Sequence, residues 1–146
     1  FAPCTAEACM ELLRAHGIDP AGRRVTIVGR SLVIGRPAAL LLTRADATVT
    51  LCHRKTPDLA ARCRDADILL AAAGTPGLIT TDFVRPGQIV LDAGATALPD
   101  GTLRGDVAPD AAAITVCTPV PGGIGSVTTA LLLRHTVQAA ENLRHF

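Results

Sequence analysis

Short apolar stretches alternate with longer amphipathic stretches along the chain, and Gly, Pro or Asp separates most of them. The short stretches are rich in β-branched residues and predict strands at residues 24–28, 47–52, 68–72, 89–92 and 114–117. The longer ones predict helices at residues 5–16, about 37–44, 58–64 and from 126 or 128 to about 145, and residues 94–105 predict a loop or hairpin. This alternation predicts an α/β fold, a doubly wound, Rossmann-like and mostly parallel sheet of about five or six strands with helices on both faces.

Capping residues indicate where the predicted helices begin. Thr5 is the expected N-cap of the first helix, because its hydroxyl oxygen can accept from an amide of the first turn. Pro37 falls in the first turn of the second helix, where its missing N–H costs nothing. Ser126 or Thr128 is expected to cap the last helix, which we expect to end near His145.

Length and composition indicate a single domain, residues 1–146, with no membrane or nucleic-acid partner. The 146 residues are 49% hydrophobic and 18% charged, which suits one core and excludes a disordered chain. No apolar run approaches the roughly 20 residues that a membrane span needs. The net charge is +1 and there is no Trp or Tyr, so the sequence offers nucleic acid neither a basic face nor a stacking platform.

The cysteine, lysine and tyrosine content limits the chemistry. Five cysteines without C-x-x-C spacing predict reduced thiols in a cytoplasmic protein and no metal site; they are Cys4, Cys9, Cys52, Cys63 and Cys117. Lys55 is the only lysine and tyrosine is absent, so this chain cannot hold a Tyr–Lys acid–base pair. The chain opens on Phe1 without a signal peptide, and we expect it to be part of something longer.

The first predicted strand leads through a glycine-containing turn, residues 29–35, into a helix. The amino end of a helix offers free N–H groups and a positive dipole end, which suit a pyrophosphate. Gly29 allows a tight exit from the strand, and Gly35 allows close approach of the helix. The spacing is not G-x-G-x-x-G, so two interpretations stay open: a cofactor phosphate loop, or a structural turn with surface arginines.

The end of the second predicted strand, residues 52–55 (CHRK), is basic. Folds that prefer NAD place an acid at this position to bind the ribose hydroxyls. Arg54 and Lys55 would instead attract a 2′-phosphate, and Arg30 lies on the adjacent loop. The pattern favours NADP over NAD, and the alternative is a solvated basic turn without a ligand.

Four segments together, residues 29–37, 47–56, 66–69 and 118–125, resemble the bifunctional methylenetetrahydrofolate dehydrogenase/cyclohydrolase family. Residues 3–5, residues 105–107 and the last helix match as well, in order and with similar spacing. The resemblance implies that this chain is the family's C-terminal NAD(P)-binding domain. An N-terminal folate domain is then expected upstream, carrying a Tyr-x-x-x-Lys motif whose lysine does the chemistry. No catalytic residue is therefore expected in this chain, which alone should be inactive.

In full length, the resemblance implies NADP-dependent oxidation of 5,10-methylenetetrahydrofolate to the 5,10-methenyl form, followed by hydrolysis to 10-formyltetrahydrofolate. The implied partners are a one-carbon tetrahydrofolate derivative, the protein's own N-terminal domain and a second copy in a homodimer. The implied cofactor-binding residues are Gly29, Arg30, Ser31, Arg54, Ala95 and Thr128. The implied wall beside the substrate and the nicotinamide consists of Pro119, Val120, Pro121, Gly122 and Gly123.

Three segments depart from the family pattern. Ser126 and Val127 replace Pro-Met, residues 92–96 read DAGAT instead of DVGIN, and residues 3–8 read PCTAEA instead of PCTPxG. The first two lie at the expected nicotinamide end. A second interpretation is therefore that the chain is a catalytically silent or diverged paralogue. A third interpretation is that it belongs to an NADP oxidoreductase acting on another small substrate.

Two further expectations concern the ligand cleft. Asp92 and Asp106 could form an acid–base pair, but their positions favour structural roles, with Asp92 ending a strand and Asp106 ordering a turn. Prolines and glycines make residues 118–128 a stiff loop that a flat ligand can approach closely. We expect Gly123→Val to block the ligand and to change stability little.

Overall fold

Parallel strands form the central sheet of the computed structural model, which describes residues 1–143. Within those residues the strand order is β2-β1-β3-β4-β7. The strands are β1 (Arg24–Val28), β2 (Thr48–Cys52), β3 (Ile68–Ala71), β4 (Ile89–Asp92) and β7 (Val116–Cys117). From β1 the chain passes to β2 on one side and then crosses to β3 on the other, so the order reverses between β1 and β3. The predicted doubly wound sheet is confirmed, and this reversal marks where such sheets bind ligands.

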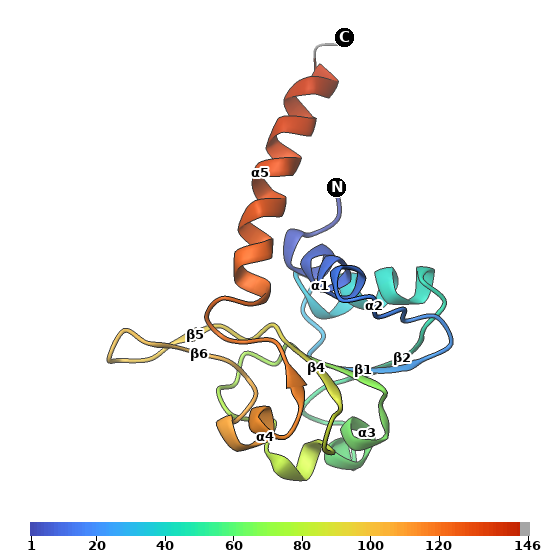
Figure 1. The fold of residues 1–146 in the computed structure, drawn as a ribbon, viewed down its shortest axis with the longest axis vertical. Coiled ribbons are helices and arrows are strands. Elements are labelled where there is room, and N and C mark those ends of the chain that lie inside the picture. The colour runs from blue at the N-terminus through green and yellow to red at the C-terminus, as the bar shows by residue number, and fades with distance from the viewer. Residues whose placement is uncertain (144–146) are drawn as a thin grey trace.

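Helices cover both faces of the sheet (Figure 1). One face packs against α1 (Cys4–Ala15), α2 (Gly35–Arg44) and α5 (Ile124–Leu143). The other packs against α3 (Leu59–Asp65), the 3-10 helix η1 (Thr81–Phe83) and α4 (Pro109–Ala113). Alternation along β1 divides its side chains between the two layers: Val25 and Ile27 join the first core, and Val28 joins the second.

The predicted helix caps are wrong. Helix α1 begins at Cys4 after Pro3, whose extended ψ of 126° sets the boundary, so Thr5 lies inside the helix. Helix α5 begins at Ile124, ahead of both predicted caps, and the Thr128 hydroxyl donates to the Ile124 carbonyl at 2.9 Å. The predicted end of this helix near His145 lies outside the described residues.

Short elements account for the other differences from the predicted elements. Neither η1 nor α4 was predicted, because each is too short to show a helical period. The predicted strand 114–117 shrinks to β7, since the amide of Ile114 closes the last turn of α4 on the Ala111 carbonyl. The predicted hairpin is present as β5 (Thr96–Ala97) and β6 (Leu103–Arg104), paired antiparallel.

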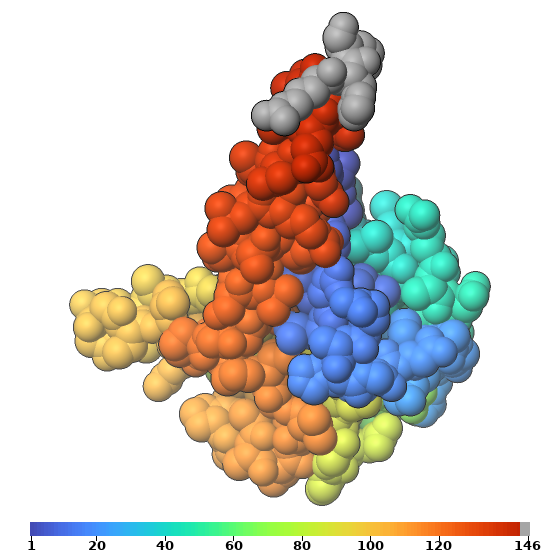
Figure 2. Space-filling model, turned by 45° about the horizontal axis from the view of Figure 1, so that its top comes forward, coloured from blue at the N-terminus to red at the C-terminus, as the bar shows by residue number. Residues whose placement is uncertain are grey.

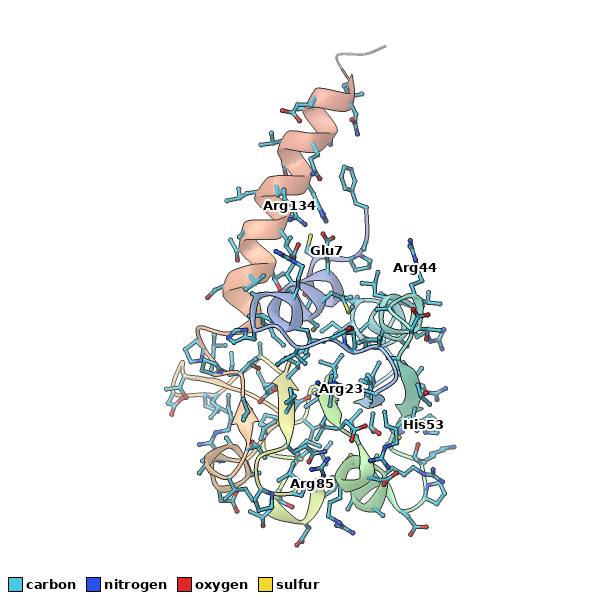
Figure 3. The ribbon with its side chains drawn as sticks, turned by 45° about the vertical axis from the view of Figure 1, so that its right-hand side comes forward. Glu7, Arg23, Arg44, His53, Arg85 and Arg134 are labelled. Carbon is cyan, nitrogen blue, oxygen red and sulfur yellow. The ribbon has the colours of Figure 1, made fainter. Side chains whose placement is uncertain are left out.

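Two elements project from the body of the molecule, the β5–β6 hairpin and the C-terminal part of α5 (Figure 2). The middle of α5 is held against α1 by Arg134, which pairs with Glu7 and Glu11, and by His135 Nε2, 2.9 Å from Glu7 Oε2 (Figure 3). Within residues 1–143, no helix has both the length and the apolar character needed to cross a membrane.

Candidate functional site

A cavity of about 680 Å³ opens at the carboxyl ends of β3 and β4, where α5 begins. Its walls come from residues 72–74 after β3, residues 92–96 after β4 and residues 119–126 leading into α5. Ser31 and Ile34 of the turn after β1 also line it, as do Thr5, Leu103, Thr128 and Thr129. This volume is within the range of small-molecule and cofactor sites.

Two glycines shape the turn between β1 and α2. A Cβ on Gly29, whose φ is +124°, would overlap the carbonyl oxygen of Ala72 at the end of β3. A Cβ on Gly35 would overlap the carbonyl oxygen of Gly29. Only glycine therefore lets this turn fold back so closely at the reversal point of the sheet. The consequence is that the amino end of α2 lies directly beside the ligand crevice.

Ser31 presents a hydroxyl group at that helix terminus. Its Oγ accepts a hydrogen bond from the Ile34 amide at 3.1 Å, which leaves the hydroxyl hydrogen available to donate to a ligand. Ser31 is exposed and lines the cavity. An anionic oxygen beside it would also meet the positive dipole end of α2.

The predicted basic residues leave the same edge of the sheet. β1 and β2 pair in register up to Val28 and Cys52, and the Gly29 amide donates to the Cys52 carbonyl at 2.9 Å. Arg30 and the basic pair at positions 54–55 follow directly and are exposed. His53 closes the turn, because its Nδ1 accepts from the Lys55 amide at 3.2 Å (Figure 3).

Asp106 fixes the loop after β3. It is fully buried, and its Oδ2 accepts from the amides of Ala73, at 2.5 Å, and Gly74, at 2.9 Å. Its Oδ1 accepts from the Thr75 amide at 2.8 Å. The predicted turn-ordering role of Asp106 is confirmed, and the turn that it orders forms one wall of the cavity.

Asp92 ends β4 as predicted, and backbone amides hold its carboxylate as they hold that of Asp106. Its Oδ1 accepts from the amides of Gly94 (2.9 Å) and Asp106 (3.0 Å), and its Oδ2 accepts from the Val107 amide (2.9 Å). Burial raises the pKa of Asp92, while these hydrogen bonds oppose that shift. The carboxylate is thus tied to backbone amides and is not free to move protons to a ligand.

The loop before α5 is tighter than expected. A Cβ on Gly123, which is buried, would overlap the carbonyl oxygen of Pro119. The expectation that Gly123→Val would leave stability unchanged is therefore wrong. Gly125 has open space around its missing side chain and lines the cavity. Cys117, just before the loop, is half-buried, and burial raises the pKa of its thiol to about 11, so it is not an activated nucleophile.

The structure gathers most of the predicted site residues in one cavity. Ser31, Ala95, Thr128 and all of residues 119–123 line it, whereas Gly29, Arg30 and Arg54 belong to the adjoining edge of β1 and β2. Thr128 keeps oxygen lone pairs for a ligand although its hydrogen is used within α5. Among residues 1–143, no group of three or more His, Cys, Asp or Glu side chains is placed to hold a metal ion.

Sequence reasoning missed the loop after β3. Residues 72–74 form a wall of the cavity, and they are fixed by Asp106, whose hydrogen-bond partners lie 31 to 33 positions away in the chain. The glycines at 74 and 77 signalled only a turn. Nothing local showed which carboxylate that turn would meet.

A family model described as "Tetrahydrofolate dehydrogenase/cyclohydrolase, NAD(P)-binding domain" matches residues 3–144. The chain belongs to this family. It is 60% identical over 144 residues to bifunctional protein FolD 1 of Rhodococcus jostii (strain RHA1), covering 96% of the chain and 48% of that relative. The chain spans about half the length of the curated relatives it matches.

Solved structures of FolD proteins have the same fold. The bifunctional enzyme FolD from Campylobacter jejuni is 44% identical, with a TM-score of 0.92 over 97% of this chain and 51% of that one. FolD from Trypanosoma brucei, complexed with NADP cofactor and inhibitor, is also 44% identical, with a TM-score of 0.86 over 94% of this chain and 50% of that one. The cavity and the glycine turn described above therefore belong to a FolD-type NAD(P)-binding domain.

Proposed function

We propose that this chain is the NADP-binding half of a bifunctional enzyme. The full protein would oxidise 5,10-methylenetetrahydrofolate to the 5,10-methenyl form and hydrolyse that product to 10-formyltetrahydrofolate. One observation carries the proposal: a glycine-tight turn at the reversal point of the sheet lies between a large cavity and a strand end that is basic and has no acid. Relatives named bifunctional FolD support the reaction.

The residues present fit a dinucleotide. Gly29 and Ser31, with the amino end of α2, would hold the pyrophosphate, since they offer amides, a hydroxyl and a positive dipole end. Arg30 and Arg54 would hold the 2′-phosphate, and the absence of an acid at the end of β2 favours NADP over NAD. When bound, NADP supplies the hydride acceptor.

Ala95 and Thr128 would face the nicotinamide end, because both line the main cavity. Residues 119–123 would form the wall between the nicotinamide and the folate. Pro121 and Gly122 are exposed, so a flat ring can lie against them without displacing a side chain. This chain orients the cofactor and excludes water on its own side of the ligand, while the catalytic lysine would come from the N-terminal domain.

The N-terminal domain would pack on the projecting part of α5. This contact would cover the exposed apolar side chains of α5. Those side chains are between 58% and 73% exposed and belong to Leu132, Leu133, Val137 and Leu143. A homodimer would use the open edge of the sheet, where Val116 of β7 is 61% exposed, together with Leu103 of the projecting hairpin. Five free cysteines support a reducing, cytoplasmic location.

The test separates binding from turnover. The 146-residue chain is titrated with NADP⁺ and NAD⁺ by calorimetry and then assayed with 5,10-methylenetetrahydrofolate, alone and fused to the N-terminal half of the Rhodococcus jostii relative. We expect tighter binding of NADP⁺ than of NAD⁺, no turnover by the chain alone, and turnover by the fusion. A chain that binds neither cofactor would contradict the proposal.

The second candidate is a catalytically silent or diverged paralogue. It is favoured by Ala95 and Ser126, which depart from the family pattern and line the same cavity. A fusion that binds NADP⁺ but does not turn over would support it. Restoring the family residues, Ala95→Ile with Ser126→Pro and Val127→Met, should then recover activity.

A further inference from the structure

The main cavity, which opens at the carboxyl ends of β3 and β4, is lined almost entirely by uncharged side chains. Among the residues that line it, Asp92 is the only one with a charged side chain. Asp106 lies directly behind, with its amide 3.0 Å from Asp92 Oδ1. Both side chains are buried, with Asp92 4% and Asp106 0% exposed. Two buried carboxylates therefore lie next to each other at the carboxyl end of β4.

Backbone hydrogen bonds hold both carboxylates in place. Six backbone amides donate to them, three to each, and every carboxylate oxygen accepts at least one. Glycines leave the room that this packing needs, because a Cβ on Gly94 would overlap Asp106 and a Cβ on Gly105 would overlap Asp92. Burial raises the pKa of Asp92, and its amide donors oppose that shift by stabilising the anionic form.

Among the described residues, no cationic side chain lines this cavity. Neither carboxylate takes part in an ion pair within residues 1–143. Arg30 and Arg54 leave from the ends of β1 and β2, on the phosphate side. Arg104 does not line this cavity; it lines a neighbouring cavity of about 440 Å³ that Asp92 also lines. The first-turn amides of α5 add only a partial positive charge, about half of one elementary charge.

We propose that Asp92 and Asp106 make this end of the cavity a seat for a cationic ring, and so select the oxidised nicotinamide cofactor over the reduced one. The inference rests on the proposed function, which places the nicotinamide here. The oxidised ring carries a positive charge and the reduced ring is neutral. The phosphates and riboses are common to both forms, so their contribution cancels in the ratio of affinities. Buried carboxylates are weakly screened and act on that difference.

The test measures the ratio of the Kd for NADPH to the Kd for NADP⁺ by calorimetry with the 146-residue chain. We expect a ratio above one in the wild type, and a decrease of about three- to tenfold in Asp92→Asn and Asp106→Asn. Asp100→Asn is the matched control. Asp100 also accepts a backbone hydrogen bond, from Thr102 at 2.9 Å, but it lies exposed at the tip of the hairpin, so the ratio should not change.

A second pair of variants keeps the test decisive if the asparagine variants fail to fold. Ala95 is exposed and lines the cavity, so Ala95→Lys adds a positive charge there while both aspartates stay in place. Ala95→Gln is its uncharged control. Ala95→Lys should lower the ratio relative to Ala95→Gln. Equal affinity of the wild type for both forms, or a ratio that Ala95→Lys leaves unchanged, would overturn the inference and spare the proposed function. Binding of neither form would overturn both.

Discussion

Gly29 and Ala72 are in close contact where the sheet reverses its strand order. The Ala72 amide donates to the Val28 carbonyl at 2.8 Å, and the Ala72 carbonyl oxygen occupies the space that a Cβ on Gly29 would need. The turn that leads to the proposed phosphate site is thus fixed by backbone packing between β1 and β3, before any ligand binds. The contact couples fold stability to the geometry of the site.

The first prediction follows from that contact. Gly29→Ala should lower the free energy of unfolding by at least about 3 kcal/mol, because it adds both a steric overlap and an unfavourable φ. Gly22→Ala is the control: Gly22 has a φ of +71° with nothing within 4 Å, so the change should cost only about 1 kcal/mol. Urea unfolding of both variants measures the difference, and equal losses would show that the overlap is relieved cheaply.

Arg54 should set the preference for NADP. A charge-assisted phosphate contact is worth roughly 1.5–3 kcal/mol, so Arg54→Ala should weaken NADP⁺ binding by about ten- to a hundredfold and leave NAD⁺ binding nearly unchanged. Arg44→Ala is the control. It removes another exposed arginine, at the C-terminal end of α2, and should change the affinity for neither cofactor. Parallel titrations decide the matter. An equal loss for the two cofactors would contradict a contact with the 2′-phosphate.

The ion pairs that Arg134 of α5 makes with Glu7 and Glu11 of α1 should weaken in acid. Hydrogen bonds from Arg14 and Arg134 lower the pKa of Glu11. A folded-state pKa below the unfolded value, about 4.3 for Glu, stabilises the fold above that pH, and the contribution is lost as the pH falls through the folded-state pKa. Arg134→Gln should therefore be less stable than the wild type at pH 7, and the difference should shrink as the pH falls below about 4.3 and through the folded-state pKa.

Salt gives an independent check on the ion pairs of Arg134 with Glu7 and Glu11, because these side chains are partly exposed and salt screens their charges. Urea unfolding of the Arg134→Gln variant in about 1 M NaCl at pH 7 should show a smaller loss than in dilute buffer. A stability difference that is unchanged by both acid and salt would mean that Arg134 acts through packing of its aliphatic stem.

The fold was predictable from sequence where burial is continuous. The run of buried residues in β1 and the glycines at 29 and 35 identified the strand, the turn and the helix that follow one another. Contacts made across the chain were not predictable. Asp106 reaches amides 31 to 33 positions away, and no local pattern encodes that meeting. The start of α5 was misjudged because Gly123 packs under Pro119, which moves the helix start ahead of the hydroxyl residues.

Gly123 and Gly125 differ in what their missing side chains would meet, and this difference gives the last prediction. Gly123→Val should lower the free energy of unfolding by about 2–4 kcal/mol, since its Cβ would overlap the Pro119 carbonyl. Gly125→Val should cost less than about 1 kcal/mol, because Gly125 is exposed in the first turn of α5 with open space beside it. Its added methyl groups would extend from a residue that lines the cavity.

Gly125→Val should therefore weaken NADP⁺ binding by at least about tenfold in a chain that unfolds normally, since a ligand filling the cavity would collide with the new side chain. Calorimetric titration and urea unfolding of the same preparation report the two effects separately. Gly125→Ala, with a single methyl group, should give an intermediate loss of affinity. Unchanged NADP⁺ affinity in a folded Gly125→Val chain would show that the cofactor does not enter the part of the cavity formed by residues 119–126, and the wall proposed for the nicotinamide would have to lie elsewhere.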